Sequence, residues 1–503
     1  MRRPLVAVGC LWLVVLAARA PAADPAAPRS AVRPLPHILW FVVDDMSADF
    51  GCYGETLVAT PHVDRLAVEG TRFRHAFVTA PVCSPCRSAL ITGMYQTTIG
   101  AHHHRSGRGA LAIDLPAPVR PLPEVLRGAG YWTCIGEGLG ADASAAGRPG
   151  KTDYNFRWDP AIYDGSDWAG RAPGQPFFMQ VTLPGGKLRG QGGEATERLA
   201  ARARERFGAA VDPEAVTLPP YYPRDPVLLV DRAAYLDAVR FTDDHVGRVM
   251  ARLEREGLLA GTLVVFMTDH GISHARGKQF LYDEGTHVPL VVRGPGIPRG
   301  AVRDDLVEHI DLAALSLAAA GVAVPPWMEG RDLFAEQYRP RAAVFAARDR
   351  CDETIDRLRS VRTPTHLYIR NELPRRPALQ PNAYKDDKAI IRRLRELHAA
   401  GTLDPLADRL LFAPERPAEE LYDWTTDPHQ LHNLAADPAH AVVLAEMRGR
   451  LAAWRAATGD PGAESPAMYA SDMAVYLDEA KDARREEIER NIALLKAWAA
   501  EGR

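Results

Sequence analysis

The chain has 503 residues, of which 47% are hydrophobic and 25% are charged, an ordinary globular composition. Its 61 basic and 64 acidic residues leave a formal net charge of -3, so no nucleic-acid partner is expected. An anionic ligand would have to be bound by a local cluster of cations. This length favours one large α/β sheet with a smaller appended region.

The first 23 residues have the pattern of a cleaved signal peptide. Arg2 and Arg3 precede an apolar stretch from Leu5 to Ala18, and Ala18-Arg19-Ala20 has the form of a cleavage site. A membrane anchor is the alternative, but this stretch is shorter than the ~20 apolar residues that cross a bilayer. The sequence therefore predicts no stable membrane span and export to a periplasmic or extracellular location.

Short apolar runs alternate with helical patterns, which is typical of a mostly parallel sheet wrapped by helices. An amphipathic helix is expected over 232–256, directly before one of these runs. The predicted strands are 37–43, 177–181, 262–267 and 290–292. In such sheets ligands bind beyond the carboxyl ends of the strands.

Acidic residues follow two of these strands. Asp44 and Asp45 come after the first, and Asp269, followed by His270, comes after the third. Three carboxylates in one crevice would repel one another unless a cation compensated them, and oxygen ligands favour Ca²⁺ or Mg²⁺. The alternative is that Asp44 and Asp45 cap a helix.

Glycine and proline indicate where the regular pattern is interrupted. The segment 136–150 has the composition of a loop insertion, and 185–210 is expected to be an exposed excursion or a flexible helix. Pro325-Pro326 indicates a turn toward a second region. We predict a catalytic domain over 35–335 and a C-terminal subdomain over 340–503, which starts with a strand at 342–345 and ends in a helical tail over about 470–498.

A cysteine motif lies between the first two predicted strands: Cys83-Ser84-Pro85-Cys86-Arg87, with Gly93 six positions after the arginine. The Cys-x-x-Cys pair could be a redox dithiol or half of a zinc site, although no second Cys or His pair at suitable spacing is apparent. Removal of the signal peptide leaves an odd number of cysteines, so at least one thiol is unpaired or modified. These cysteines are Cys52, Cys83, Cys86, Cys134 and Cys351.

This motif resembles the signature of the type I, formylglycine-dependent sulfatases. The segment 420–435 is similar to their C-terminal subdomain, including that of the sulfamidase (N-sulfoglucosamine sulfohydrolase) branch. The resemblance implies an alkaline-phosphatase-like α/β fold, with a large mixed, mostly parallel sheet flanked by helices and a smaller α+β C-terminal subdomain. It also implies that a formylglycine-generating enzyme converts Cys83 into the aldehyde nucleophile.

The resemblance also implies a metal site. In the family pattern Asp44, Asp45, Asp269 and the residue after it bind Ca²⁺ together with the formylglycine derived from Cys83. That last position is usually Asn, whereas this chain has His270. Nitrogen is a poorer calcium ligand than oxygen, so Mg²⁺ stays an alternative.

Three basic residues match the family's catalytic and substrate-binding cations. Arg87 would bind oxygens of the nucleophile or of the sulfate, unless it is only a surface cation. Lys278 lies in 277–285, which resembles the stretch whose lysine contacts sulfate, and would stabilise charge in the transition state. Lys151 resembles a second family lysine.

The chain departs from the family at the group that protonates the leaving atom. Many members have a histidine just after the central strand, whereas this chain reads Thr182-Leu183-Pro184-Gly185-Gly186-Lys187. Lys187 is one substitute, and His274 or a member of the triplet His102-His103-His104 is another, because histidine donates protons near neutral pH. Cys86 occupies a position that is commonly Ser or Ala.

The sequence thus predicts a sulfohydrolase that acts on sulfated saccharides, through O-sulfate esters or N-sulfoglucosamine. The first alternative is a phosphodiesterase or phosphonate hydrolase of the same superfamily. The second is a degenerate sulfatase that binds sulfated glycans without turnover, which the missing central histidine motivates.

Overall fold

The structure is a computed structural model that describes residues 35–140 and 150–503, together with Met1. The predicted signal peptide, apart from Met1, and most of the predicted 136–150 loop lie outside the described residues. Residues 35–503 form one compact unit, within which the domain boundary near 335–340 stays a prediction. None of the helices in the described part combines the length and the apolar character needed to cross a bilayer.

The large sheet has eight strands in the order β3-β4-β1-β5-β6-β2-β7, with β8 beside β2. Strands β3, β4, β1 and β5 are parallel, and β6 is antiparallel to both β5 and β2. The predicted mixed, mostly parallel sheet is therefore confirmed. Its strands are β1 (His37–Val43), β2 (Thr71–Phe77), β3 (Trp132–Gly136), β4 (Phe177–Leu183), β5 (Thr262–Thr268), β6 (His287–Arg293), β7 (Ala301–Arg303) and β8 (Val307–Glu308).

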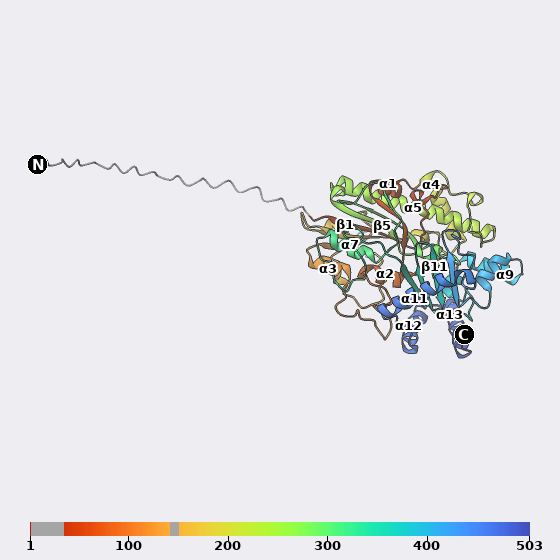
Figure 1. Ribbon diagram of the computed structural model, residues 1–503. Helices are drawn as coiled ribbons and strands as arrows, with labels where there is room; N and C mark the ends of the chain where they lie inside the picture. Colours follow the sequence, from red (N-terminus) through yellow and green to blue (C-terminus); the bar gives the residue numbers. More distant parts are fainter. Residues whose placement is uncertain (2–34, 141–149) are drawn as a thin grey trace. The chain divides into compact units, whose positions relative to one another are not determined.

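Alternation along β1 builds a core on each face of this sheet. Ile38, Trp40 and Val42 pack toward α2, α3 and α7, whereas the residues between them pack toward α1, α4 and α5. Figure 1 shows these two groups of helices on opposite sides of β1 and β5. The helices are α1 (Pro61–Glu69), α2 (Cys83–Thr92), α3 (Leu122–Gly128), α4 (Glu194–Phe207), α5 (Pro226–Arg255), α6 (Asp283–Thr286) and α7 (Asp311–Ala319).

Two segments differ from the sequence prediction. Helix α5 begins six residues earlier than expected, because Asp225 caps it by accepting from the Val227 amide and Pro226 occupies its first turn. The expectation of an exposed 185–210 excursion is wrong for its first part. A short 3₁₀ helix, η4 (Gly185–Arg189), is largely buried, and Arg189 pairs with Asp231 at 3.0 Å.

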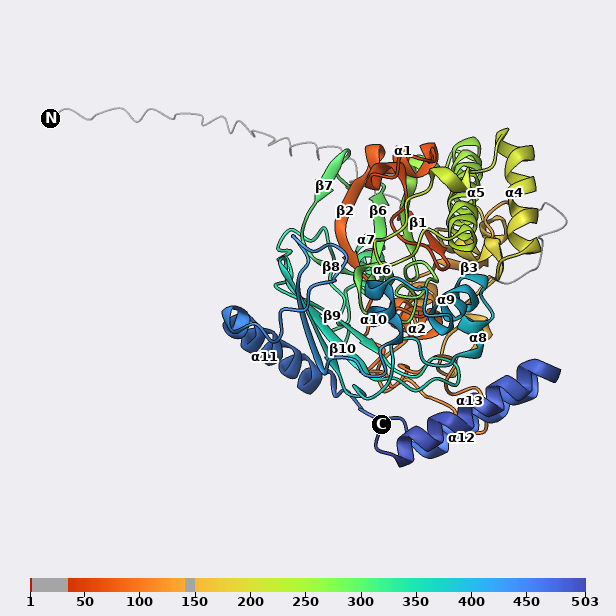
Figure 2. The same cartoon turned by 90° about the vertical axis from the view of Figure 1, so that its right-hand side faces the viewer.

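A second, antiparallel sheet in the order β12-β11-β10-β9 forms the smaller C-terminal α+β part. Helix α11 packs on one of its faces, as Figure 2 shows beside β9 and β10. The strands are β9 (Val344–Arg348), β10 (Leu358–Arg362), β11 (His366–Asn371) and β12 (Glu419–Asp423). The helices are α8 (Ala383–Asp386), α9 (Ala389–Ala399), α10 (Pro405–Phe412), α11 (Ala441–Thr458), α12 (Pro466–Glu479) and α13 (Asp482–Ala500).

Candidate active site

The acidic residues directly follow the ends of two adjacent parallel strands, β1 and β5. Val43 of β1 pairs with Thr268 of β5, so Asp44 and Asp269 follow at the same edge of the sheet. Asp45 has a φ of 52°, in the left-handed region, and its amide donates to Asp269 Oδ1 at 3.1 Å. Cys83 is the first residue of α2, and its Sγ lies 3.2 Å from His270 Nε2. The strand ends and the helix start therefore converge on one point.

Arg87, in the second turn of α2, bridges the carboxylates of Asp44 and Asp269. Its guanidinium contacts Asp44 and donates to Asp269 Oδ2 at 3.1 Å, and only 3% of its side chain is exposed. The surface-cation interpretation of Arg87 is therefore wrong. The same contacts show that the Asp44 carboxylate does not cap a helix here.

Cys86 does not act as a partner of Cys83. Both thiols are free, and the Cys86 thiol donates to the Asp269 carbonyl at 2.6 Å. Within the described ranges, no group of potential metal ligands contains both cysteines. The redox-dithiol and zinc-site interpretations of the motif gain no support.

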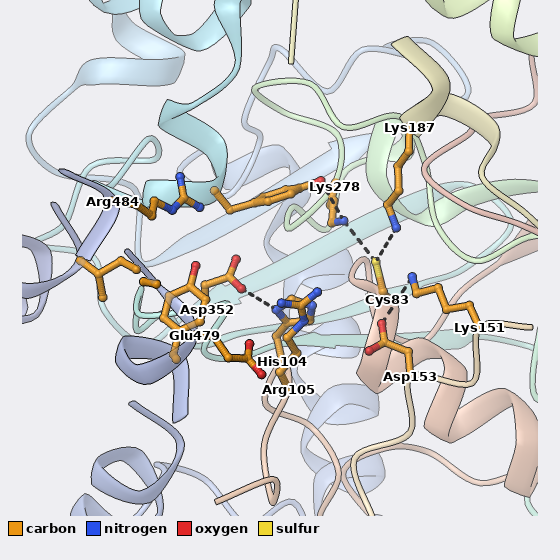
Figure 3. A pocket seen from close by; sticks show the side chains of 14 residues that line it. Cys83, His104, Arg105, Lys151, Asp153, Lys187, Lys278, Asp352, Glu479 and Arg484 are labelled. Atoms are coloured by element: carbon orange, nitrogen blue, oxygen red, sulfur yellow. Dashed lines mark hydrogen bonds and ion pairs between the residues drawn. The ribbon is translucent and has the colours of Figure 1, made fainter. Parts of the chain in front are cut away.

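Three lysines, Lys151, Lys187 and Lys278, surround Cys83 (Figure 3). Lys278 Nζ lies 3.1 Å and Lys187 Nζ 3.7 Å from Cys83 Sγ, whereas Lys151 Nζ lies 3.0 Å from Asp44 Oδ2. Burial alone would raise the pKa of the Cys83 thiol, but the three ammonium groups outweigh it and hold that pKa well below its usual value. The pocket therefore favours negative charge at position 83.

The side chains beside Cys83 offer ligand atoms for a divalent cation, and oxidation of Cys83 to formylglycine would replace its sulfur by oxygen, which Ca²⁺ and Mg²⁺ prefer. Ligand atoms of Asp45, Cys83 and His270 lie within 4.8 Å of one another. Burial, with Asp44 nearby, raises the pKa of Asp269 to about 6 even though His270 and Arg87 oppose the shift. Burial would raise the pKa values of Asp44 and Asp45, but Arg87 at Asp44 and the neighbouring lysines at both hold them well below their ordinary value, so these two carboxylates are ionised and can bind a cation.

His270 is oriented for such a role. Its Nδ1 lies 2.9 Å from the Gly271 carbonyl, which can only accept, so Nδ1 carries a proton. Nε2 points toward Asp45 and Cys83 at 3.3 and 3.2 Å. Burial would lower the pKa of His270, but Asp269 and Cys83 raise it above its ordinary value, so a cation bound at Nε2 must displace a proton.

A pocket of about 290 Å³ opens in front of Cys83. Figure 3 shows Lys151 and Lys187 beside Cys83, and Asp352 and Arg484 across the pocket from it. The other described lining residues are His104, Arg105, Asp153, Lys278, Tyr384, Tyr476, Glu479, Ala480 and Ile488.

His104 is the one member of the histidine triplet that lines this pocket. Its Nδ1 lies 3.0 Å from Asp352 Oδ1. Burial would lower the pKa of His104, but Cys351 and Asp352 outweigh it and raise that pKa well above its ordinary value. The ring is therefore held as an imidazolium.

Two other predicted histidines lie elsewhere. His102 is in a buried cluster with His103 and Asp349, where burial lowers its pKa to about 3, so its placement gives no support to a role in the reaction. His274 does not line the pocket: its ring nitrogens lie 2.9 Å from Asp231 and 3.3 Å from Glu284.

Several lining residues were missed from the sequence. Asp153 could have been found, because it stands two positions after Lys151, and Arg105 directly follows His104. Asp352, Tyr384 and the α12 and α13 residues carry no motif, and only the fold brings them here.

The mixed, mostly parallel sheet flanked by helices, with the smaller antiparallel sheet beside it, is an α/β fold of the alkaline-phosphatase-like class. The crystal structure of a putative sulfatase from Bacteroides thetaiotaomicron superposes with a TM-score of 0.60 at 20% identity, and the match covers 86% of this chain and 96% of that one. The phosphonate monoester hydrolase of Silicibacter pomeroyi has a TM-score of 0.56 at 18% identity, covering 84% and 96%. At such identities the similarity shows the shared fold.

The sequence comparisons give the family. The Sulfatase family model matches residues 36–322. An ulvan-active sulfatase from Formosa agariphila is 32% identical over 84% of this chain and 75% of its own, and the human N-sulphoglucosamine sulphohydrolase is 29% identical over 85% and 91%. The chain belongs to the sulfatase family, which confirms the resemblance seen in the motif.

Proposed function

We propose that the protein is an exported sulfohydrolase that releases inorganic sulfate from sulfated saccharides, through an O-sulfate ester or N-sulfoglucosamine. The nucleophile would be the formylglycine that a formylglycine-generating enzyme makes from Cys83. Ca²⁺, or alternatively Mg²⁺, would be held by Asp44, Asp45, Asp269 and His270. The observation that carries the proposal is the position of Cys83 between these ligands and the ammonium groups of Lys187 and Lys278.

The names of the relatives support the substrate class. One is named for activity on ulvan and the other for N-sulphoglucosamine, and the chain spans most of both. A saccharide is therefore the first substrate to test, with N- and O-sulfated forms side by side.

The chain's own residues have separate tasks. The formylglycine would supply an oxygen nucleophile, and the cation a fixed positive charge beside it. Lys278 and Lys187 bind sulfate oxygens and stabilise the charge that grows on them in the transition state. Arg87 holds Asp44 and Asp269 in their ligand positions. Lys151 adds positive charge at the side of Asp44.

His104 is the group best placed to protonate the leaving atom. Asp352 holds it as an imidazolium, and one of its ring nitrogens lies within 4.8 Å of Cys83 Sγ. Lys187, the other candidate, already contacts Asp44 at 2.6 Å. His104 thus occupies the role left open by the missing central histidine.

The test compares 4-nitrophenyl sulfate with the matching phosphodiester on protein coexpressed with a formylglycine-generating enzyme. We expect the sulfate ester to be hydrolysed with the higher kcat/KM. A higher kcat/KM on the phosphodiester would support the phosphonate-hydrolase alternative, whose representative shares this fold. Glycan binding without sulfate release from correctly modified protein would support the degenerate alternative.

A further inference from the structure

The C-terminal hairpin, α12 and α13, lies outside the residues that the family model matches, yet it reaches the pocket. It is tied to the elements that carry His104. Asp472, 4% exposed, accepts from the Gly107 amide at 3.0 Å and from Arg350 Nη2 at 2.5 Å. Gly107 follows His104 by three residues, so α12 is fixed relative to the pocket.

Helix α13 is tied to the segments that carry Asp352 and Tyr384. Glu353 Oε1 accepts from Asn491 Nδ2 and from the Ala383 amide, each at 2.7 Å. Arg484 in turn donates to the Ala383 carbonyl. Glu353 follows Asp352, and Ala383 precedes Tyr384, so both anchors adjoin residues that line the pocket. These contacts fix the position of the hairpin relative to the pocket, as a binding surface requires.

The turn between the two helices places aromatic, acidic and basic side chains along the pocket. Tyr476 and Glu479 come from α12 and Arg484 from α13. Glu479 is exposed, and Figure 3 shows Arg484 across the pocket from Cys83. A carboxylate, a guanidinium and an aromatic ring together suit a ligand with hydroxyl donors, hydroxyl acceptors and apolar ring faces. A sugar ring has all three.

The size of the pocket limits the ligand. Its volume of about 290 Å³ lies just below the ~300–1,000 Å³ typical of small-molecule sites. One sulfated ring fits such a space, with its sulfate at Cys83 and its remaining hydroxyls at the hairpin.

We propose that the turn of the α12–α13 hairpin is the saccharide-binding wall of this pocket, which restricts turnover to a single, chain-terminal sulfated sugar ring. The inference rests on the proposed sulfohydrolase function and specifies its substrate. Glu479 accepts hydrogen bonds from the ring hydroxyls, Arg484 donates to them, and Tyr476 packs against the ring.

The test measures Glu479→Gln on two kinds of substrate. One is 4-nitrophenyl sulfate, and the other is the best substrate of the wild type among N-sulfoglucosamine, glucosamine 6-sulfate and N-acetylgalactosamine 6-sulfate. We expect kcat/KM on the saccharide to fall about tenfold, the effect of one lost hydrogen bond to a charged group. Turnover of the aryl sulfate should stay within about twofold.

The matched control is Asp478→Asn, which neutralises the adjacent, exposed carboxylate that does not line the pocket. This variant should have the wild-type kcat/KM on both substrates. Equal losses of Glu479→Gln on both substrates, or no loss on the saccharide, would overturn the inference. A wild type that hydrolyses neither substrate contradicts the proposed function instead.

Binding decides the inference even without turnover. In a Cys83→Ala background, calorimetry with the same three saccharides should show a Kd about tenfold higher for the protein that also carries Glu479→Gln. An unchanged Kd overturns the proposed wall.

The single-ring restriction is tested with two trisaccharides that each carry one sulfate. The sulfate on the terminal ring should be released, and equal release from a trisaccharide sulfated on its middle ring would refute the restriction.

Discussion

The two ends of the pocket are built in different ways. The sulfate end uses residues that stand next to one another along strand ends and the first turns of α2: Asp44 with Asp45, Cys83 with Arg87, and Asp269 with His270. The other side of the pocket combines His104, Asp352 and the α12–α13 hairpin, which are separated from one another by more than 100 residues in the sequence. Local motifs thus encode the proposed catalytic residues, whereas tertiary packing assembles the surface that we propose selects the leaving group.

The largest expected effect is at the nucleophile. Cys83→Ala should lower kcat on any sulfate ester by about 10⁴-fold or more, since the nucleophile is gone and only binding remains. Cys86→Ser, at a thiol bonded to the Asp269 carbonyl, is the control and should retain most activity. Steady-state assays on 4-nitrophenyl sulfate measure both. Comparable losses in the two variants would argue for a role of the Cys-x-x-Cys pair.

Removal of the divalent cation should affect the same end of the pocket. Chelation should reduce kcat by about 10³-fold, because a bound cation contributes several kcal/mol of charge stabilisation. Added Ca²⁺ should restore activity, and titration with Mg²⁺ identifies the preferred ion. Full activity of protein that elemental analysis shows to be metal-free would contradict the site at Asp44, Asp45, Asp269 and His270.

Lys278→Met tests whether the sulfate-binding side of the pocket acts equally on all sulfate esters. Loss of this ammonium, 3.1 Å from Cys83 Sγ, should lower kcat by about 10²–10³-fold, as for other transition-state donors. The loss should be equal on aryl and saccharide sulfates, because both place sulfate at this end. A loss confined to saccharides would assign Lys278 to the leaving group instead.

The hairpin anchor should make stability depend on pH. Burial, with Asp352 nearby, raises the pKa of Glu353 from 4.5 to about 7. The folded state then binds more protons than the unfolded state between these values, so stability falls as pH rises through them. The loss is about 3 kcal/mol.

Glu353→Gln should remove this dependence while keeping an acceptor for Asn491 and the Ala383 amide. Urea unfolding of wild type and variant at pH 5 and pH 8 measures it. The exposed α13 residue Glu486, changed to Gln, is the control. Parallel pH curves for wild type and Glu353→Gln would refute the assignment.

The sequence predicted the parts of the molecule that short-range patterns determine. The strand 37–43 matches β1 to the residue, because an apolar run buried on both faces has an abrupt polar end. Asp44 and Asp269 could be placed together because parallel strands end at one edge, whereas Cys83 was placed with them by the resemblance of its motif to the sulfatase signature. Lys151 and Lys278 followed from motifs that the fold brings to the same pocket.

The remaining features depend on tertiary contacts. Of three adjacent histidines only His104 reaches the pocket, since the backbone after Gly100 turns, with Arg105 itself at a φ of 54°. The burial of η4 depends on the Arg189–Asp231 pair across 42 residues. Tyr476 and Glu479 resemble any other surface residues of an amphipathic helix until the hairpin is docked. No local pattern distinguishes them.

The central claim is that residue 83 acts as a formylglycine. Mass analysis of the peptide that spans Cys83 should be done on protein coexpressed with a formylglycine-generating enzyme, and sulfate release should be measured on the same sample. We predict that the peptide carries an aldehyde in place of the thiol, and that sulfate release rises in proportion to the converted fraction. Full sulfate release from protein in which Cys83 is entirely a thiol would contradict the account.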